Sequence, residues 1–345
     1  MARRASLLFV MVVAFGLQNV RGGDEPAAAS GPWVGVHVGV GDENALKKLR
    51  AQVPALAELG VNALVIEVNY GFDYQSHPEL VHPGVITRDG AREFAEVCRT
   101  KGVRVIPSIN CLGHQSWAEH TGPLLDEHPE FDETPGKYPN NKGIYCRSWC
   151  PLHPDVNGVV FALMDELIDA FGADAFHVGM DEVFIIADED CPRCKGKAPA
   201  ELFAKAVNDL HGHLVGERKV EMFMWGDRLL DAKALGYSKW EASENGTAGA
   251  VDKIPKDIVV CDWHYEKKPV DYPSIAFLLG KGLRVWPAGW HDIEAAEALM
   301  DVAIGQKNPR MVGYLSTTWG RVPLDRLDSF PPTRLAAEKF RSAPK

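Results

Sequence analysis

Eight short apolar runs alternate with helix-like stretches along most of the chain. The runs cover residues 33–38, 63–69, 103–110, 175–182, 221–227, 258–265, 284–289 and 312–319. In residues 43–59, 89–100, 156–171, 199–215, 272–279 and 293–304, apolar side chains recur every three or four positions, as in amphipathic helices. Runs without a clean polar–apolar alternation are typical of strands buried on both faces, and intervening helices make such strands parallel.

Eight parallel strands favour closure into a barrel. We therefore predict an α/β fold, a (β/α)₈ TIM barrel that forms a single domain over residues 32–345 and includes a C-terminal helix. An open doubly wound sheet is the rival fold, but the chain has neither a Gly-x-Gly-x-x-Gly turn after the first run nor a phosphate loop. The long non-periodic stretch 111–153 follows the third run, so in a barrel it would lie over the catalytic mouth.

The N-terminus has the order of a secretory signal peptide, predicted here over residues 1–23. Arg3 and Arg4 precede an apolar run over 7–17, and the small residues Gly22 and Gly23 follow it. We expect an exported protein, secreted or periplasmic, with residues 24–31 as a flexible leader. No segment approaches eighteen consecutive apolar residues, so the sequence predicts no transmembrane span.

The chain is acidic, with a formal net charge of −10 and no cluster of Lys and Arg. Binding to nucleic acid or to an anionic membrane depends on such clusters, so both are excluded as expected partners. The sequence carries no signal for a particular oligomeric state.

Four of the seven cysteines are closely spaced, as Cys146 with Cys150 and Cys191 with Cys194. In an exported chain these pairs favour one or two disulfides plus buried thiols, and a four-thiolate structural zinc site is the alternative. Neither pair has the pattern of a catalytic thiol.

Aromatic and acidic side chains gather where the predicted strands end. These positions are Glu67, Asn69, Asn110, His114, Trp117, His177, Asp181, Glu182, Trp225, Asp227, Trp263, Tyr265, Trp286, Trp290 and Trp319. In a barrel such positions line the catalytic mouth. Aromatic faces with interspersed carboxylates are typical of sugar sites, because the C–H faces of a pyranose stack on rings while its hydroxyls need acceptors.

One of the seven Asp-Glu dipeptides differs from the others in its surroundings. Asp181 and Glu182 end the apolar run 175–180 and are followed by the aliphatic residues 183–186. Carboxylates between apolar segments are costly to bury without a partner, so a functional role is indicated. One such role is metal binding: His177, Asp181 and Glu182, together with His37 or His114, form the ligand set of an alternative, metal-dependent hydrolase.

The residues around this dipeptide resemble a known family. The sequence His-Val-Gly-Met-Asp-Glu at 177–182 resembles the His-x-Gly-Gly-Asp-Glu signature of glycoside hydrolase family 20, the β-N-acetylhexosaminidases, with Met180 in place of the second Gly. Gly113-His114 resembles the family's Pro-Gly-His turn. Residues 66–67, 72–74 and 77–80 resemble its hexosaminidase D-like branch, which lacks an accessory domain before the barrel.

The resemblance implies an exported retaining hydrolase that removes terminal β-linked N-acetylhexosamine from glycans, with no cofactor. The substrate's acetamido oxygen would attack the anomeric carbon and form an oxazolinium intermediate. Asp181 would orient the acetamido group, Glu182 would be the general acid and then the base, and Tyr265 would bind the acetamido carbonyl. Further implied contacts are Trp225, Trp263 and Trp319 around the sugar, His114 and His177 tuning the carboxylates, and Glu67 and Asp227 accepting hydroxyl hydrogen bonds.

Two departures from the family pattern leave a second alternative open. Asn110 stands where members commonly have an acid that would pair with His114, and residues 34–38 lack the family's first-strand arginine. These changes are compatible with a catalytically impaired, glycan-binding barrel protein.

Overall fold

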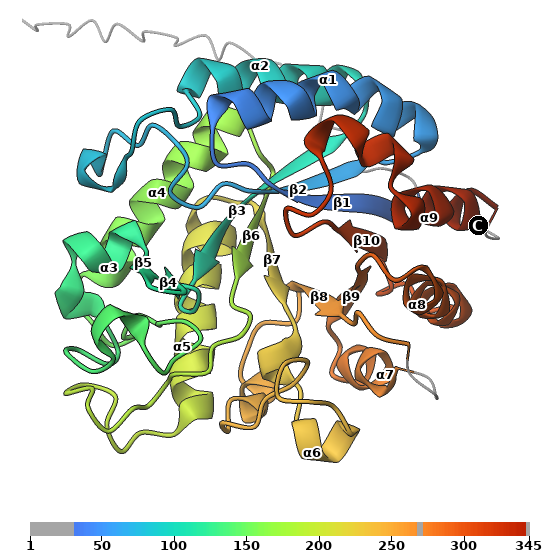
Figure 1. The fold of residues 1–345 in the computed structure, drawn as a ribbon. Helices are drawn as coiled ribbons and strands as arrows, with labels where there is room; N and C mark the ends of the chain where they lie inside the picture. Colours follow the sequence, from blue (N-terminus) through green and yellow to red (C-terminus); the bar gives the residue numbers. More distant parts are fainter. Residues whose placement is uncertain (1–30, 268–271, 343–345) are drawn as a thin grey trace, which may run out of the picture. The chain divides into compact units, whose positions relative to one another are not determined.

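The computed structural model describes residues 31–267 and 272–342. The predicted signal peptide over 1–23 and all but the last residue of the predicted leader over 24–31 lie outside the described residues. All eight predicted strands are present, and they form a closed barrel with parallel pairing throughout (Figure 1). The predicted (β/α)₈ fold is therefore confirmed.

The barrel strands follow one another in chain order around the circle. They are β1 (Trp33–Gly39), β2 (Ala63–Glu67), β3 (Arg104–Cys111), β6 (Ala175–Gly179), β7 (Glu221–Trp225), β8 (Val259–Trp263), β9 (Arg284–Gly289) and β10 (Gly313–Thr317). The short strands β4 (Ser116–Trp117) and β5 (His120–Thr121) form a separate antiparallel pair in the long segment after β3. The register between β3 and β6 shifts between Ser108 and Cys111. Irregularities of this kind occur next to active sites, where they redirect a side chain, here that of Asn110.

Helices surround the barrel in the described residues (Figure 1). They are α1 (Glu43–Leu59), α2 (Arg88–Thr100), α3 (Pro123–Glu127), α4 (Val156–Phe171), α5 (Pro199–His211), α6 (Ala232–Leu235), α7 (Pro273–Gly280), α8 (Ile293–Gly305) and α9 (Pro331–Ser342). α5 continues into a π-helical turn over Gly212–Glu217, where the sequence predicted unbroken helix to residue 215. After β7 the long helix is replaced by the four-residue α6 and 3₁₀ turns.

Local sequence sets the helix ends. The carboxylate of Asp42 accepts a hydrogen bond from the N–H of Ala45 and caps α1, and Asp292 caps α8 in the same way. α1 and α4 end at Gly60 and Gly172, which take the left-handed conformation with φ of 116° and 56°. These caps explain why the predicted helix bounds are close to the observed ones.

Large side chains fill the inside of the barrel. Trp225 and Trp286 are buried there together with Phe223 and Leu315. Gly35 makes room for this packing, because a Cβ at that position would lie 2.2 Å from the Trp286 ring. A second, larger apolar cluster lies between the barrel and its helices. The barrel is thus a packed core and not a channel.

Within residues 31–267 and 272–342, none of the helices combines the length and the apolar character needed to cross a bilayer.

Candidate active site

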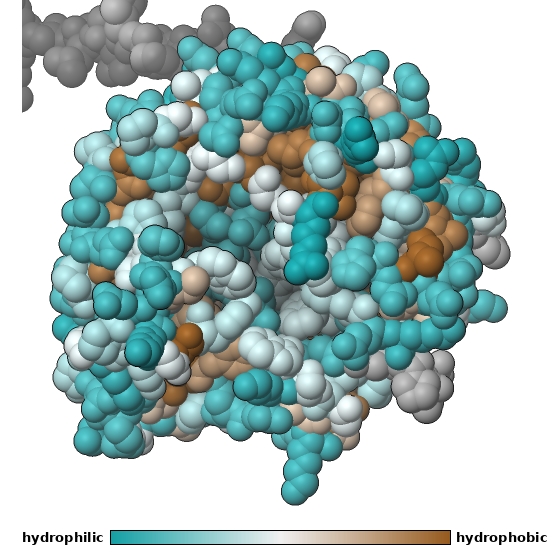
Figure 2. Space-filling model, in the orientation of Figure 1, coloured by the Kyte–Doolittle hydropathy of each residue, from teal (hydrophilic) through white to brown (hydrophobic). Residues whose placement is uncertain are grey.

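A cavity of about 650 Å³ opens at the carboxyl ends of the barrel strands. In Figure 2 the surface is hollowed near its centre, over the barrel of Figure 1. The cavity is lined by His37, Gly39, Glu67, Asn69, Asn110, His114, Ser116, Trp117, Tyr145, Asp181, Glu182, Trp263, Tyr265, Trp290, Trp319, Gly320 and Arg321. This is the end of the barrel at which (β/α)₈ enzymes carry their active sites.

The backbone after β6 turns sharply to present Asp181 and Glu182. Gly179, Met180 and Glu182 have φ of 66°, 74° and 49°, in the left-handed region that L side chains rarely adopt. Gly179 also lies close to β3, since a Cβ there would stand 2.7 Å from Asn110 Oδ1. Strained backbone of this kind persists where the surroundings enforce it, and it is concentrated at functional sites.

His114 lies between the two carboxylates. Its Nε2 is 3.2 Å from Asp181 Oδ2 and 3.3 Å from Glu182 Oε2. Burial acts to lower the pKa of His114, but the charge of Asp181 and contacts with both carboxylates outweigh it and raise that pKa well above its usual value. The two carboxylates thus favour the protonated form of the imidazole. Asp181 Oδ1 is buried and has no hydrogen-bond partner within the described chain.

Asp227 lies behind Glu182 and not in the wall of the cavity. Its side chain is 2% exposed, and Oδ2 accepts hydrogen bonds from the N–H of Glu182 at 2.9 Å and from Arg228 Nε at 2.6 Å. Burial raises the pKa of Asp227 to about 6, although Arg228 acts in the opposite direction. This position suits support of the Glu182 backbone more than the hydroxyl contact predicted from the sequence.

Glu67 ends β2 and lies at the centre of a polar network. One carboxylate oxygen is 3.2 Å from His37 Nε2, and the other accepts hydrogen bonds from Asn69 Nδ2 at 2.9 Å and Asn110 Nδ2 at 3.2 Å. Burial acts to raise the pKa of Glu67, but the contacts with His37 and Asn69 keep it below its usual value. Glu67 lines the cavity wall, where its carboxylate can accept hydrogen bonds from a ligand. Asn110, the neutral amide that departs from the family pattern, contacts Glu67.

Aromatic rings form the opposite wall. Trp319 Nε1 donates a hydrogen bond to the Tyr265 hydroxyl oxygen at 2.6 Å. Trp263 stacks on Tyr265 with ring centroids 4.9 Å apart, and Trp290 packs at 5.4 Å from the same ring. The Tyr265 hydroxyl also contacts the side chain of Thr317, so two neighbours fix its position. Trp263, Tyr265 and Trp319 are thus brought together as predicted.

His177 and Trp225 lie beneath the cavity and do not line it. Their rings pack edge to face at 4.7 Å. His177 Nδ1 accepts a hydrogen bond from the N–H of Gly179 at 3.1 Å, and burial lowers the pKa of His177 to about 3. The neutral imidazole therefore shapes the turn that carries the carboxylates. It is not placed to bind a metal together with Asp181 and Glu182.

The sequence did not identify the large side chains of His37, Tyr145 and Arg321 as sugar contacts, although all three line the cavity. His37 lies in β1, Tyr145 comes from the long segment after β3, and Arg321 follows β10. The Arg321 guanidinium lies over the Trp290 ring at 4.7 Å. Burial and the charge of Glu182 raise the pKa of Tyr145, whose ring closes one side of the cavity. The sequence did contain a signal for Tyr145, because it lies in residues 111–153, which were predicted to cover the mouth of the barrel.

Three clusters of side chains in the described residues have donor atoms close enough to share a metal ion, within 4.8 Å of one another. One is formed by His114, Asp181 and Glu182, and a second by the more exposed His77, Glu79 and His128. The third consists of Glu133, Cys150, Cys191 and Cys194. Cys146, which was grouped with the other three thiols from its spacing, is not in the third cluster. Its thiol instead donates to the carbonyl oxygen of Glu182 at 3.6 Å. All seven cysteines are free thiols.

The chain is similar to proteins of one enzyme family. Residues 36–283 match the family model described as the glycosyl hydrolase family 20 catalytic domain. A β-hexosaminidase of Vibrio furnissii is 26% identical over 188 residues, which cover 54% of this chain and 28% of that protein. Hexosaminidase D of Bos taurus is 23% identical over 185 residues, covering 52% of this chain and 50% of that protein.

Solved structures extend the similarity over most of the barrel. A crystal structure of a β-N-acetylhexosaminidase superposes with a TM-score of 0.65 at 19% identity, covering 90% of this chain and 72% of that one. At this identity the superposition is evidence for the fold. The chain spans half or less of the length of the two hexosaminidases matched by sequence.

Proposed function

The chain belongs to glycoside hydrolase family 20, and from that premise we propose that it removes terminal β-linked N-acetylhexosamine from glycans with retention, by substrate-assisted catalysis. The observation that carries the proposal is the adjacent pair Asp181 and Glu182, which faces a cavity walled by aromatic rings. Stacking surfaces and paired carboxylates are what hydrolysis of an aminosugar requires.

The acetamido group of the substrate would act as the nucleophile. Asp181 Oδ1 is buried and without a hydrogen-bond partner among residues 31–267 and 272–342, so it is free to accept the acetamido N–H. The Tyr265 hydroxyl, fixed by Trp319, would donate to the acetamido oxygen. Together these contacts would hold the oxygen below the anomeric carbon, and the Asp181 charge would offset the positive charge of the oxazolinium ion.

Glu182 would transfer the protons. As the general acid it would protonate the leaving oxygen, and in the second step it would take a proton from the water that opens the oxazolinium ring. Its backbone N–H is anchored to Asp227 at 2.9 Å, which limits the positions that its side chain can reach. The leaving oxygen departs from the face of the sugar at which water later enters, opposite to the face attacked by the acetamido oxygen. Two successive inversions therefore retain the configuration at the anomeric carbon.

His114 would set the charge of the site. A protonated imidazole about equally close to both carboxylates would offset part of their negative charge. Across the cavity, the ionised Glu67 would accept hydrogen bonds from sugar hydroxyls, and the rings of Trp263 and Trp319 would stack on the sugar.

A pair of aryl substrates tests the proposal. Chromophore release is expected from an aryl β-N-acetylglucosaminide or galactosaminide and not from the aryl β-glucoside, which lacks the acetamido group. Asp181→Asn is expected to slow release by at least 100-fold, in line with loss of one preorganised electrostatic contact. The exposed Glu189→Gln serves as the matched control and should leave the rate unchanged. Equal turnover of both substrates would contradict substrate assistance.

The grouping of His114, Asp181 and Glu182 supports one alternative, a metal-dependent hydrolase. In that case elemental analysis of the active wild-type protein would find a divalent ion that Asp181→Asn lacks, and removal of that ion would abolish activity. A glycan-binding barrel protein, the other alternative, would bind N-acetylhexosamine in calorimetry without releasing chromophore.

Export belongs to the same proposal. The Arg3–Arg4 pair, the apolar run over 7–17 and the following glycines support removal of residues 1–23 during secretion. N-terminal sequencing of the protein recovered from the periplasm or medium should begin near residue 24. Recovery of the full chain from the cytoplasm would contradict export.

A further inference from the structure

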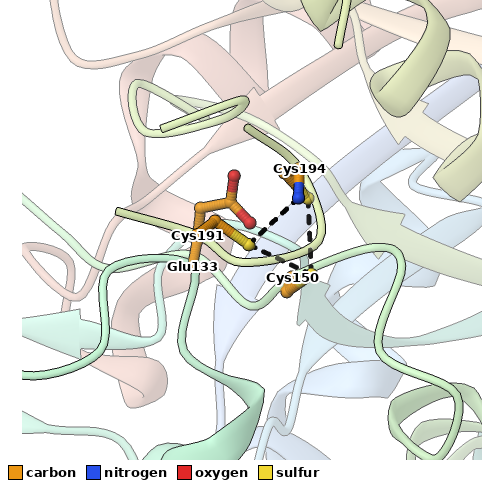
Figure 3. Close-up of side chains that lie close together, drawn as sticks. All are labelled: Glu133, Cys150, Cys191 and Cys194. Carbon is orange, nitrogen blue, oxygen red and sulfur yellow. Dashed lines mark hydrogen bonds between the residues drawn. The ribbon is translucent and has the colours of Figure 1, made fainter. Parts of the chain in front are cut away.

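Two segments on the catalytic side of the barrel bring three cysteines and one glutamate together. Glu133 and Cys150 lie between β5 and α4, whereas Cys191 and Cys194 lie between β6 and α5. All four side chains are buried, and they converge from both segments in Figure 3. We propose that Glu133, Cys150, Cys191 and Cys194 bind one structural zinc ion that joins the two segments.

The spacing of the sulfur atoms suits a shared ion. Cys150 Sγ lies 3.3 Å from Cys194 Sγ and 3.5 Å from Cys191 Sγ. A disulfide bond is about 2.05 Å long, whereas four bonds of about 2.3 Å at tetrahedral angles place the ligand sulfurs about 3.8 Å apart. The observed sulfur separations are close to the edge length of such a tetrahedron.

Glu133 supplies an independent observation. Its carboxylate is fully buried, and Oε1 accepts a hydrogen bond from the N–H of Asp188 at 3.1 Å. The other oxygen, Oε2, is buried without a hydrogen-bond partner in the described part of the chain. A buried carboxylate oxygen left unpaired carries a large desolvation cost, which a cation removes.

The chemistry of the donors identifies zinc. Thiolate sulfur favours zinc, and a carboxylate is an accepted fourth ligand in a tetrahedral site. Calcium and magnesium take oxygen ligands and would not select three thiols. The N–H of Cys194 donates to Cys191 Sγ at 3.3 Å, a contact that stabilises a thiolate in the Cys191-x-x-Cys194 turn. Three thiolates and a carboxylate fill all four positions, so the ion would have no open position for substrate.

The ion would set the position of one cavity wall. The first segment carries Tyr145 and the second begins with Asp181 and Glu182, all of which line the cavity. None of the four proposed ligands lines it, so the zinc would be separate from the reacting groups.

Metal and thiol content test the proposal together. The full chain is expressed with zinc in the medium and purified without reductant or chelator. Elemental analysis is expected to find one zinc per chain. After denaturation with a chelator, Ellman's reagent is expected to find all seven thiols. Absence of zinc would overturn the proposal, whether all seven thiols remain or a disulfide has removed two of them.

Variants locate the ion. Cys191→Ala is expected to lose the zinc, whereas Cys98→Ala, which removes a buried thiol in α2, should retain it. Glu133→Gln is expected to weaken zinc binding, measured by competition with a chelator, by about tenfold or more. Glu130→Gln, a matched change at an exposed glutamate, should not change it.

A gain-of-ligand variant keeps the proposal testable if Cys191→Ala does not fold. Glu133→Cys would supply a fourth thiolate, so it should keep one zinc per chain. After exchange with cobalt, this variant should show stronger thiolate-to-cobalt absorption than the wild-type protein. Zinc retained in full by Cys191→Ala, or an unchanged affinity in Glu133→Gln, would overturn the assignment.

Discussion

The Asp227 carboxylate accepts a hydrogen bond from the backbone N–H of Glu182 at 2.9 Å, although the two residues follow different strands. Glu182 has a φ of 49°, so this contact holds a strained backbone at the proposed acid. The same carboxylate oxygen pairs with the buried guanidinium of Arg228. One Asp227 oxygen atom therefore bonds both to the turn that carries Glu182 and to the buried Arg228 in the segment after β7.

Removal of this contact should affect both stability and turnover. Asp227→Ala leaves the Arg228 charge buried without its carboxylate, which is expected to lower the free energy of unfolding by about 3 kcal/mol. The freed Glu182 backbone should lower kcat more than it raises KM. Urea denaturation and aryl-substrate kinetics measure these effects. Asp231→Ala, which removes the cap of α6, should cost only about 1 kcal/mol and leave kcat unchanged. An unchanged kcat in Asp227→Ala would contradict the supporting role.

Tyr265 is expected to act on the acetamido group through its hydroxyl. Tyr265→Phe keeps the ring that packs against Trp263 and removes the donor, so kcat/KM should fall by about 100-fold for N-acetylhexosaminides. Tyr314→Phe is the matched control, because the Tyr314 hydroxyl is buried and has no partner among the residues described. Equal effects of the two substitutions would show that Tyr265 has a purely structural role.

The stability of the fold should depend on pH through His264. This imidazole is fully buried and contacts Glu241 Oε1 at 2.9 Å and Asp262 Oδ1 at 3.3 Å. Burial acts to lower its pKa, but the charge of Asp262 and contacts with both carboxylates raise it to about 9.

A pKa raised on folding means that the folded state holds the proton more tightly. The contribution of His264 is therefore complete below the unfolded pKa of about 6.5 and is lost as pH rises through about 9. The expected loss is on the order of 3 kcal/mol. Urea denaturation between these pH values measures it. His264→Gln should flatten the dependence, and the exposed His120→Gln should not. An equal slope in all three proteins would exclude His264 as the source.

Gly179 is predicted to tolerate no side chain. In Gly179→Ala the new Cβ would take a φ of 66° and lie 2.7 Å from Asn110 Oδ1, so the turn and the Glu67 network must both shift. Gly172→Ala provides the control, since its φ is 56° but nothing lies within 4 Å of the added carbon. The control should lose about 1 kcal/mol through backbone strain alone. Gly179→Ala should lose clearly more stability than the control, and it should also lose most of its activity. Equal losses of stability in thermal unfolding would contradict a role for the close approach of Gly179 to Asn110.

The sequence predicted the strands well, but it predicted poorly which residues hold the site in place. The barrel strands are buried on both faces, so the pattern of apolar runs was enough to locate them. Asp181 and Glu182 stood out because they interrupt such a run. The observed β6 ends at Gly179, three residues before the predicted end, because the turn at Gly179 and Met180 leaves the strand conformation. That conformation is not encoded in hydrophobicity.

Contacts between distant segments could not be read from spacing. Cys146 is four residues from Cys150 and was grouped with it, yet its thiol points toward Glu182. Glu133 takes the place beside the other three thiols from a position 17 residues before Cys150. Asp227 was expected at the cavity wall because it follows a strand end, but the 3₁₀ turn over Asp227–Leu229 buries it.

The packed barrel beneath the cavity also sets a limit on the proposed substrate. Trp225 and Trp286 are buried in the barrel below the site, so the cavity does not continue through the barrel. Under the proposed function a polysaccharide would therefore not thread through the barrel, and its chain end would lie against the cavity floor. The released monosaccharide would leave on the side from which the next chain end arrives, so product departure and substrate entry would exclude each other in every turnover.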